Sequence, residues 1–138
     1  MVGLNVWSGG DYSKSTYGGT GSLTASISNE WCSNGDVSYK IIQDIEEYKY
    51  YQFANITGSL GETYQAKFNI LNKSGEPVKL RLLQITDSLT KEVNIYSLDN
   101  VQTITATITL TTNSELRLRV VMYHPGTIFI DNITLIKI

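Results

Sequence analysis

The side chains of this sequence that are best suited to contact a ligand are aromatic: nine tyrosines, two tryptophans and three phenylalanines among 138 residues. A tyrosine on a solvent-facing strand offers a flat apolar ring that can stack on the C–H face of a sugar, and a hydroxyl that can hydrogen-bond. Tyrosine also favours strands and fills half-buried sheet positions. The phase of each ring within its strand therefore decides between a binding role and a core role.

Strand phase separates these rings into groups. Tyr64 is in phase with the apolar residues of its segment, which predicts a core position. Tyr48, Tyr50 and Tyr51 lie so close together that at least one ring must point outward, whichever phase their strand adopts. Which of these three rings faces solvent stays open.

A second aromatic position is accompanied by basic side chains. Tyr123 shares one face of its segment with Arg117 and Arg119, opposite an apolar face. Arginine and amide side chains donate hydrogen bonds that suit sugar hydroxyls. The candidate carbohydrate-binding residues are therefore Tyr48, Tyr50, Tyr123, Arg81, Gln84, Arg117 and Arg119.

Catalytic signatures are scarce by comparison. The one histidine, His124, precedes Pro125 in a predicted turn, where a solvated side chain is expected rather than a catalytic one. One cysteine and one histidine are too few for a zinc site. Glu46 and Glu47 are adjacent, so they point to opposite faces of a strand or are both solvated in a turn. We predict no catalytic residues and regard a small glycoside-processing enzyme as the least favoured reading.

Composition and charge exclude several function classes. Charged residues make up 17% of the chain, below the roughly 25% of an average globular protein, and the net charge is −2. Because the basic residues are scattered, we expect neither a nucleic-acid partner nor an anionic membrane partner. No apolar run approaches the roughly 20 residues of a membrane span, so we expect no membrane insertion. The single Cys32 cannot form an internal disulfide, which leaves both oxidising and reducing compartments open.

The elements that position the candidate residues are short strands. Apolar residues alternate with period two and nowhere repeat at helical spacing over three turns. The strand candidates are residues 22–27, 37–43, 50–56, 64–70, 78–86, 92–98, 101–111, 116–122 and 127–138. Nine or ten short strands at this spacing predict an all-β sandwich of two antiparallel sheets, with residues 1–138 as a single domain.

Two segments predict details of this sandwich. Residues 101–111 carry threonine at every second position, which gives one hydroxyl face and one apolar face. The alternation of residues 127–138 slips by one at Asp131-Asn132, which predicts a β-bulge.

The order of these features resembles the xylan- and β-glucan-binding jelly-roll family of carbohydrate-binding modules that is appended to bacterial xylanases and cellulases. Three segments carry the resemblance: residues 33–41 (SNGDVSYKI), like the family's glycine turn into a "slkv" strand, residues 60–68 (LGETYQAKF), like "l-x-G-x-t-Y", and residues 126–135 (GTIFIDNITL), like "y-i-D-n-v-x-l". Roughly four-fifths of the chain lies within this frame.

The resemblance implies a jelly-roll sandwich and two features of the site. The family's last-strand Asp often helps to hold a structural calcium, which makes Asp131 a possible metal ligand. The Phe-Glu pair that supplies another ligand in the family is not recognisable here, and Asp131 and Asn132 would alternatively hydrogen-bond a loop backbone. The family's cleft aromatic follows the "slkv" strand, where Tyr48 or Tyr50 stands and a Trp is more usual.

These observations lead to one functional hypothesis and one alternative. The first is non-catalytic binding of a polysaccharide or glycan through an exposed, tyrosine-bearing sheet face, in a module of a larger multidomain protein that works outside the cell or on its surface. The alternative is a structural or protein-contact β-sandwich of a surface adhesin or virus tail protein, with no sugar site. The threonine face of residues 101–111 suits both.

Overall fold

The described part of the chain consists of strands, their connections and one short 3-10 turn. The computed structural model describes residues 4–8, 20–31 and 38–138. Cys32, the glycine turn of the first family-like segment and the glycine-rich stretch 9–19 lie outside the described residues. The strands are β1 (Leu4–Ser8), β2 (Thr20–Gly21), β3 (Thr24–Ser28), β4 (Ser38–Gln43), β5 (Lys49–Gly58), β6 (Thr63–Asn72), β7 (Val78–Gln84), β8 (Leu89–Ile95), β9 (Gln102–Thr109), β10 (Ser114–Met122) and β11 (Gly126–Lys137).

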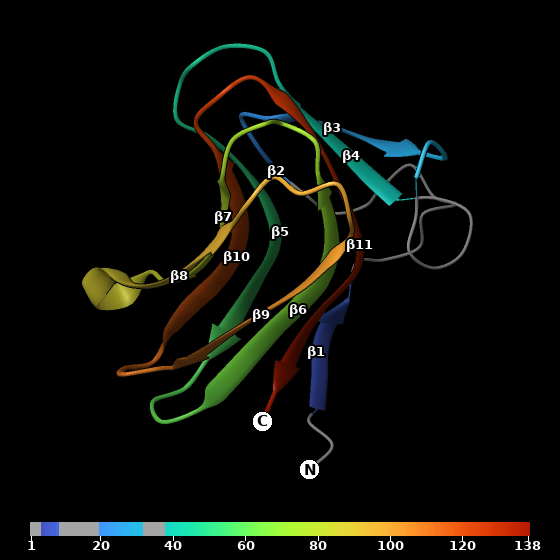
Figure 1. The fold of residues 1–138 in the computed structure, drawn as a ribbon. Helices are drawn as coiled ribbons and strands as arrows, with labels where there is room; N and C mark the ends of the chain where they lie inside the picture. Colours follow the sequence, from blue (N-terminus) through green and yellow to red (C-terminus); the bar gives the residue numbers. More distant parts are fainter. Residues whose placement is uncertain (1–3, 9–19, 32–37) are drawn as a thin grey trace.

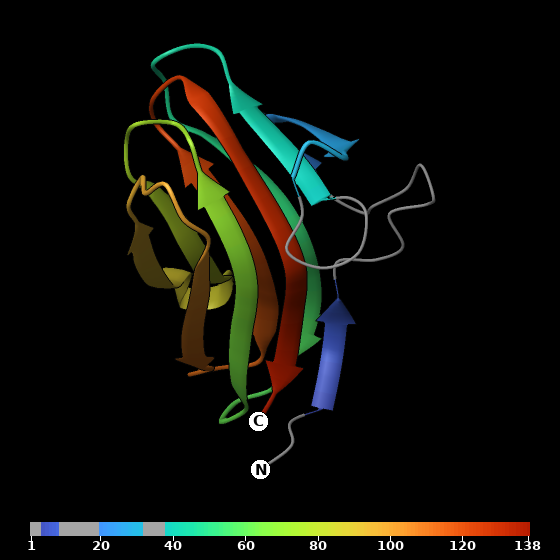
Figure 2. The ribbon, with the colours of Figure 1, turned by 45° about the vertical axis from the view of Figure 1, so that its right-hand side comes forward.

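These strands form two antiparallel sheets that pack face to face (Figure 1). One sheet has the order β3-β4-β11-β6-β9, with β1 running beside the end of β11 (Figure 2). The other has the order β2-β5-β10-β7-β8. We call them the six-stranded and the five-stranded sheet. The predicted β-sandwich of jelly-roll type is therefore confirmed.

The nine predicted segments correspond in order to β3 through β11. The sequence did not indicate β1 and β2, which are five and two residues long and flank the glycine-rich stretch. In the described parts of the chain the only helical segment is the 3-10 turn η1 (Thr86–Ser88), and no helix is long and apolar enough to cross a bilayer.

The core lies between the sheets and follows from the period-two alternation. On β10 every second residue from Ser114 to Met122 is buried, and on β7 the buried set runs from Val78 to Gln84. Fully burying one large apolar side chain contributes about 1.5–3 kcal/mol, so these rows fix which face of each strand remains for solvent. Tyr64 is 3% exposed, which confirms its predicted core position.

Aromatic rings join the two sheets in the core. The Phe53 ring on β5 lies edge-on to the rings of Tyr39 and Tyr51, with centroids 5.4 and 5.2 Å away. Such pairs contribute about 0.5–1.5 kcal/mol beyond their buried area. Tyr51 is thus the inward ring among the three neighbouring tyrosines, which places Tyr50 on the opposite face of β5.

The predicted bulge is present in β11. The register between β11 and β6 shifts between Asp131 and Thr134, and Asn132 adopts a φ of 55°. Asn tolerates this left-handed conformation better than most residues. The backbone N–H of Asn132 donates to Asp131 Oδ1 over 2.9 Å, so the Asp131 carboxylate helps to hold the bulge.

Candidate functional site

The outer face of the five-stranded sheet brings together six of the seven predicted binding residues. Tyr50 comes from β5, Arg81 from β7, and Arg117 and Arg119 from β10. The remaining two flank these strands: Tyr48 lies just before β5, and Tyr123 directly follows β10. We call this set, Tyr48, Tyr50, Arg81, Arg117, Arg119 and Tyr123, the tyrosine–arginine face.

Strand pairing explains why residues far apart in sequence meet here. Arg119 on β10 pairs with Gln52 of β5 on one side and with Arg81 of β7 on the other. Side chains directly opposite each other on neighbouring strands have Cβ atoms about 4.5–5.5 Å apart. Because β10 lies between β5 and β7, its outward residues form the middle row of the face.

The three tyrosines form a continuous cluster at the end of this face. The Tyr48 ring lies 5.4 Å from that of Tyr123 and 6.5 Å from that of Tyr50, both at inclined angles. Tyr48 is 43% exposed, and the other two side chains are half-buried. The contacts between the rings hold them in place, so the cluster offers a preformed apolar surface rimmed by hydroxyl groups.

Basic side chains line the cluster and orient its rings. The guanidinium carbon of Arg119 lies 4.1 Å from the centre of the Tyr50 ring, and its Nε donates to Gln52 Oε1 over 3.1 Å. Arg81 Nη1 donates to the Tyr48 hydroxyl over 2.8 Å. These cation–π and hydrogen-bond contacts fix the tyrosines relative to the strands.

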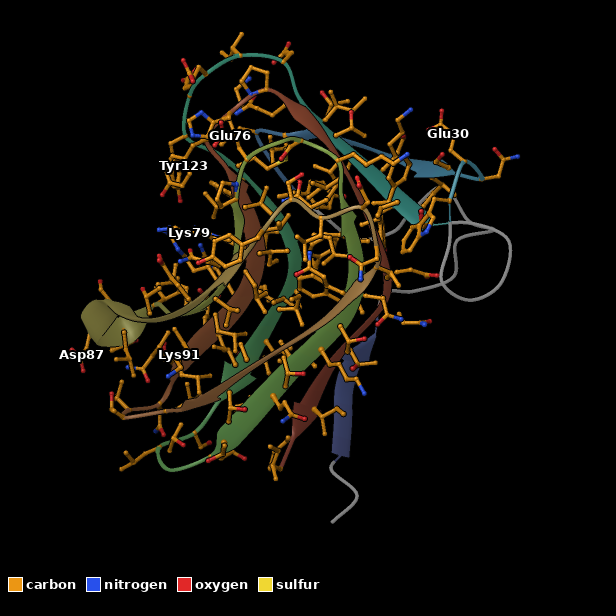
Figure 3. All side chains as sticks on the ribbon, viewed as in Figure 1. Glu30, Glu76, Lys79, Asp87, Lys91 and Tyr123 are labelled. Carbon is orange, nitrogen blue, oxygen red and sulfur yellow. The ribbon has the colours of Figure 1, made fainter. Side chains whose placement is uncertain are left out.

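An ion-pair network continues the face toward β8. Arg81 Nε donates to Glu92 Oε1 over 2.8 Å, and Lys79 Nζ donates to the other carboxylate oxygen over 3.3 Å. Burial alone would raise the pKa of Glu92, but the hydrogen bond and charge of Arg81 outweigh it and hold that pKa below its ordinary value. Lys79 Nζ also lies 5.7 Å from the Tyr123 ring, and the labelled Lys79 and Tyr123 are on the same side of the molecule in Figure 3.

Gln84 does not belong to the tyrosine–arginine face, contrary to our prediction. It is fully buried, its Nε2 donates to the Thr86 carbonyl and to Thr111 Oγ1, and its Oε1 accepts from the Thr111 backbone N–H. The phase of residues 78–86 was ambiguous because Leu82 and Leu83 are both apolar. Gln84 therefore hydrogen-bonds backbone groups just after β7 and in the connection from β9 to β10.

Sequence reasoning missed three members of the site: Gln52, Lys79 and Glu92. They carry polar side chains at outward positions, but their importance depends on which strands are neighbours. The pairing of β7 with β8 as consecutive strands would have placed Glu92 opposite Arg81. The pairing of β10 with β5, which brings Gln52 to Arg119, joins segments too distant for such reasoning.

Asp131 lies far from this face, on β11 of the other sheet. Asp131 is 1% exposed, and its carboxylate accepts the Asn132 backbone N–H. Ca²⁺ takes six to eight oxygen ligands, usually with several carboxylates. Among the described residues no group of three or more His, Cys, Asp and Glu side chains surrounds it or any other point. The described residues therefore bring no cluster of acidic side chains to Asp131, and the structural calcium stays a prediction.

His124 lies in the turn between β10 and β11, as expected. Its Nδ1 lies 2.9 Å from Glu46 Oε1, and both side chains are well exposed. In the described parts of the chain no Ser, Thr or Cys side chain hydrogen-bonds to this histidine, so nothing there forms a nucleophile–base pair.

The outer face of the six-stranded sheet is the second sheet surface open to a ligand. The threonines of β9 are exposed, and Thr103 Oγ1 donates to Asn69 Oδ1 on β6 over 2.9 Å. A hollow near β3 and β4 is lined by Glu30, Trp31, Lys40, Leu71, Lys73, Thr127 and Phe129. Glu30 lies on the opposite side of the molecule from Tyr123 (Figure 3). Of the side chains that the structure describes, fewer aromatic rings lie on this surface than on the tyrosine–arginine face, and the Phe129 ring is almost fully buried.

Solved structures share this architecture, although no protein-family model and no curated protein matches the chain. The CBM22-1 xylan-binding domain of Xyn10C from Paenibacillus barcinonensis superposes with a TM-score of 0.74 at 11% identity, over 98% of this chain and 95% of that one. A family 61 carbohydrate-binding module in complex with β-1,4-galactotriose gives a TM-score of 0.59 at 11% identity, over 88% and 89%. The enzymatically active domain of bacteriophage CBA120 tailspike protein 4 gives 0.66 at 15%, over 87% of this chain and 19% of that one.

The matched structures are nearly all carbohydrate-binding modules. The chain therefore has the fold of these modules, as the resemblance of its sequence segments predicted. At such low identities the likeness concerns the fold, and the binding function has to be argued from the side chains.

Proposed function

We propose that the tyrosine–arginine face binds a polysaccharide or glycan without catalysis. The observation that carries this proposal is the cluster of Tyr48, Tyr50 and Tyr123 on one rigid sheet face, flanked by guanidinium groups. Tyrosine rings stack on the apolar faces of sugars, and the flanking donors suit sugar hydroxyls. The fold neighbours named for xylan binding and for a galactotriose complex support it.

The affinity should be modest. A preformed face avoids the entropy of ordering loops on binding. Each sugar hydroxyl, however, exchanges water for a protein partner of similar strength, so each contact gains little net free energy. Such a module acts by keeping an attached enzyme or adhesin near its target, which raises the effective concentration of that partner. A protein of this kind is expected outside the cell or on its surface, as one domain of several.

The first prediction is that truncating the tyrosine cluster weakens binding. Tyr48→Ala removes the most exposed ring of the cluster and its contacts with both other rings. Losing about 1–1.5 kcal/mol of aromatic contact lowers affinity about tenfold. Affinity gel electrophoresis against a panel of soluble polysaccharides measures it, with Tyr50→Ala and Tyr123→Ala expected to act in the same direction.

Two matched variants locate the site. Thr107→Ala removes an exposed side chain from β9 and should leave retention unchanged. Trp31→Ala removes the aromatic ring at the hollow of the six-stranded sheet. Retention that survives all three tyrosine changes but is lost with Trp31→Ala would move the site to the opposite face. Retention by no glycan would contradict the proposal.

The second candidate function is a structural or protein-contact domain. The match to a bacteriophage tailspike and the uncharged threonine face of β9 favour it. It predicts no retention by any glycan, so the same electrophoresis separates the two functions.

A further inference from the structure

We propose that the tyrosine–arginine face selects polysaccharides that carry carboxylate groups, such as those built from uronic acids. This inference rests on the proposed function and specifies its ligand class. The chain contains three arginines among its basic residues, Arg81, Arg117 and Arg119, and all three stand on outward positions of β7 and β10. The lysines, in contrast, are spread over both sheets and the loops.

The register places two of these arginines directly opposite each other. Arg119 of β10 pairs with Arg81 of β7. Like charges at directly opposed positions destabilise a sheet. Among the described residues Glu92 neutralises Arg81, whereas Arg119 has the neutral amide of Gln52 and the ring of Tyr50 as its partners. Within the described part of the chain, Arg119 therefore lacks a counter-charge.

The surrounding strands do not supply the missing charge. Outward positions of β5, β7, β8 and β10 carry the three arginines and Lys79 but only two carboxylates, Glu92 and Glu115. Glu115 pairs with Arg117 over 3.0 Å, and the Nε of Arg117 is a buried nitrogen with no hydrogen-bond partner. In the adjoining loop Asp44 pairs with Lys49 and Glu46 with His124, and Glu47 is a third, exposed carboxylate that lies off the strands. The strand face thus carries net positive charge in a chain of net charge −2.

A sugar that carries a carboxylate would supply the negative charge that this face lacks, which a neutral sugar cannot do. The guanidinium group presents a planar fork of donors that matches the two oxygens of a carboxylate. Arg81 already binds one carboxylate on this face, since its Nε and Nη2 both meet Glu92 Oε1. Arg119 lies beside the tyrosine cluster, so a sugar stacked on the rings would bring its carboxylate next to Arg119. The tyrosines supply the stacking contact, and Arg119 distinguishes acidic from neutral sugars.

The test compares each acidic polysaccharide with its own neutral form. Polygalacturonate, alginate and glucuronoxylan are titrated beside the same polymers after reduction of their carboxyl groups, with dextran sulfate as a general polyanion. We expect at least one acidic polymer to bind tenfold or more tightly than its reduced form. Arg119→Gln should abolish this preference, and Arg119→Lys, which keeps the charge but loses the fork, should restore only part of it.

Matched controls separate specific recognition from general charge. Lys67→Gln removes one positive charge from the outer face of the six-stranded sheet and should leave the preference intact. Equal binding of acidic and reduced polymers, with Tyr48→Ala still weakening both, would overturn this inference and leave the proposed function standing. The inference would also be overturned if dextran sulfate bound as tightly as the uronate polymers and if Lys67→Gln weakened binding as much as Arg119→Gln does. Binding of neither form would reject both.

Discussion

At the residue scale, the phase of a side chain within its strand decides its role more than its chemical type does. Gln84 and Arg81 lie three residues apart on the same strand and both carry hydrogen-bond donors. Gln84 is fully buried and hydrogen-bonds backbone groups, whereas Arg81 faces outward and hydrogen-bonds the Tyr48 hydroxyl. A buried amide needs all its partners inside the protein, because leaving a buried donor or acceptor unsatisfied costs about 1–3 kcal/mol.

Gln84→Ala should therefore destabilise the domain by about 2–4 kcal/mol without weakening glycan binding under native conditions. The change leaves the Thr111 backbone N–H and the Thr86 carbonyl without their partner. Urea unfolding gives the free energy, and Gln65→Ala on the half-exposed surface of β6 serves as the control. A stable Gln84→Ala protein that has lost its glycan would show that this residue has a binding role after all.

At the element scale, the alternation of apolar and polar residues was enough to find most strands but not their partners. Segments 101–111 and 116–122 alternate cleanly, and their inward faces were predicted correctly. Segment 78–86 was found, but its consecutive leucines hid its phase. The bulge at Asp131-Asn132 was readable because a one-residue slip exchanges the two faces of a strand. The connections between strands depend on particular contacts instead.

One such contact is the close approach of two loops at Gly126. A Cβ built there would lie 2.5 Å from the Ser74 Cα, and Gly126 has a φ of 154°. We expect Gly126→Ala to lower the free energy of unfolding by about 2–4 kcal/mol. Gly75→Ala is the matched control, because its φ is also positive at 81° but nothing lies within 4 Å of the added carbon. Gly75→Ala should lower the free energy of unfolding by only about 1–2 kcal/mol, the cost of placing a side chain on left-handed backbone. Equal losses would mean that the Ser74 contact is unimportant.

A second contact ties the β5–β6 turn to the last strand. Hydrogen bonds from Lys137 and from the Ser59 backbone N–H lower the pKa of Glu62 to about 2 from its ordinary 4.5. A lowered native pKa means that the charged form stabilises the fold, fully above pH 4.5 and less as the pH falls toward 2. Glu62→Gln should therefore be less stable than the parent at pH 7, and the difference should vanish between pH 4.5 and 2.

Urea unfolding at pH 7, 5, 3 and 2 measures this difference. Glu76→Gln, at an exposed glutamate that forms no ion pair with the other described residues, is the control and should show no such convergence. A difference between Glu62→Gln and the parent that stays constant with pH would contradict the assignment of the stabilisation to this carboxylate.

At the scale of the whole molecule, the two sheets expose surfaces of different chemistry over one shared core. The six-stranded sheet carries the uncharged threonines of β9. The five-stranded sheet carries the tyrosines and all three arginines. The sequence allowed Tyr123, Arg117 and Arg119 to be grouped, since they share one strand face. That Tyr48, Tyr50 and Arg81 lie on the same face could be known only from the strand order β5-β10-β7. This order arises from pairing between strands distant in sequence and not from the local residue pattern.

The most direct test of the account is to map bound oligosaccharide on the folded domain by amide chemical shifts. A short fragment of whichever polysaccharide is retained is titrated into the isotopically labelled protein. Shift changes should gather on β5, β7 and β10 and on the residues next to Tyr48 and Tyr123, and leave β6 and β9 unchanged. Changes confined to β6, β9 and β11 would contradict the assignment of binding to the tyrosine–arginine face.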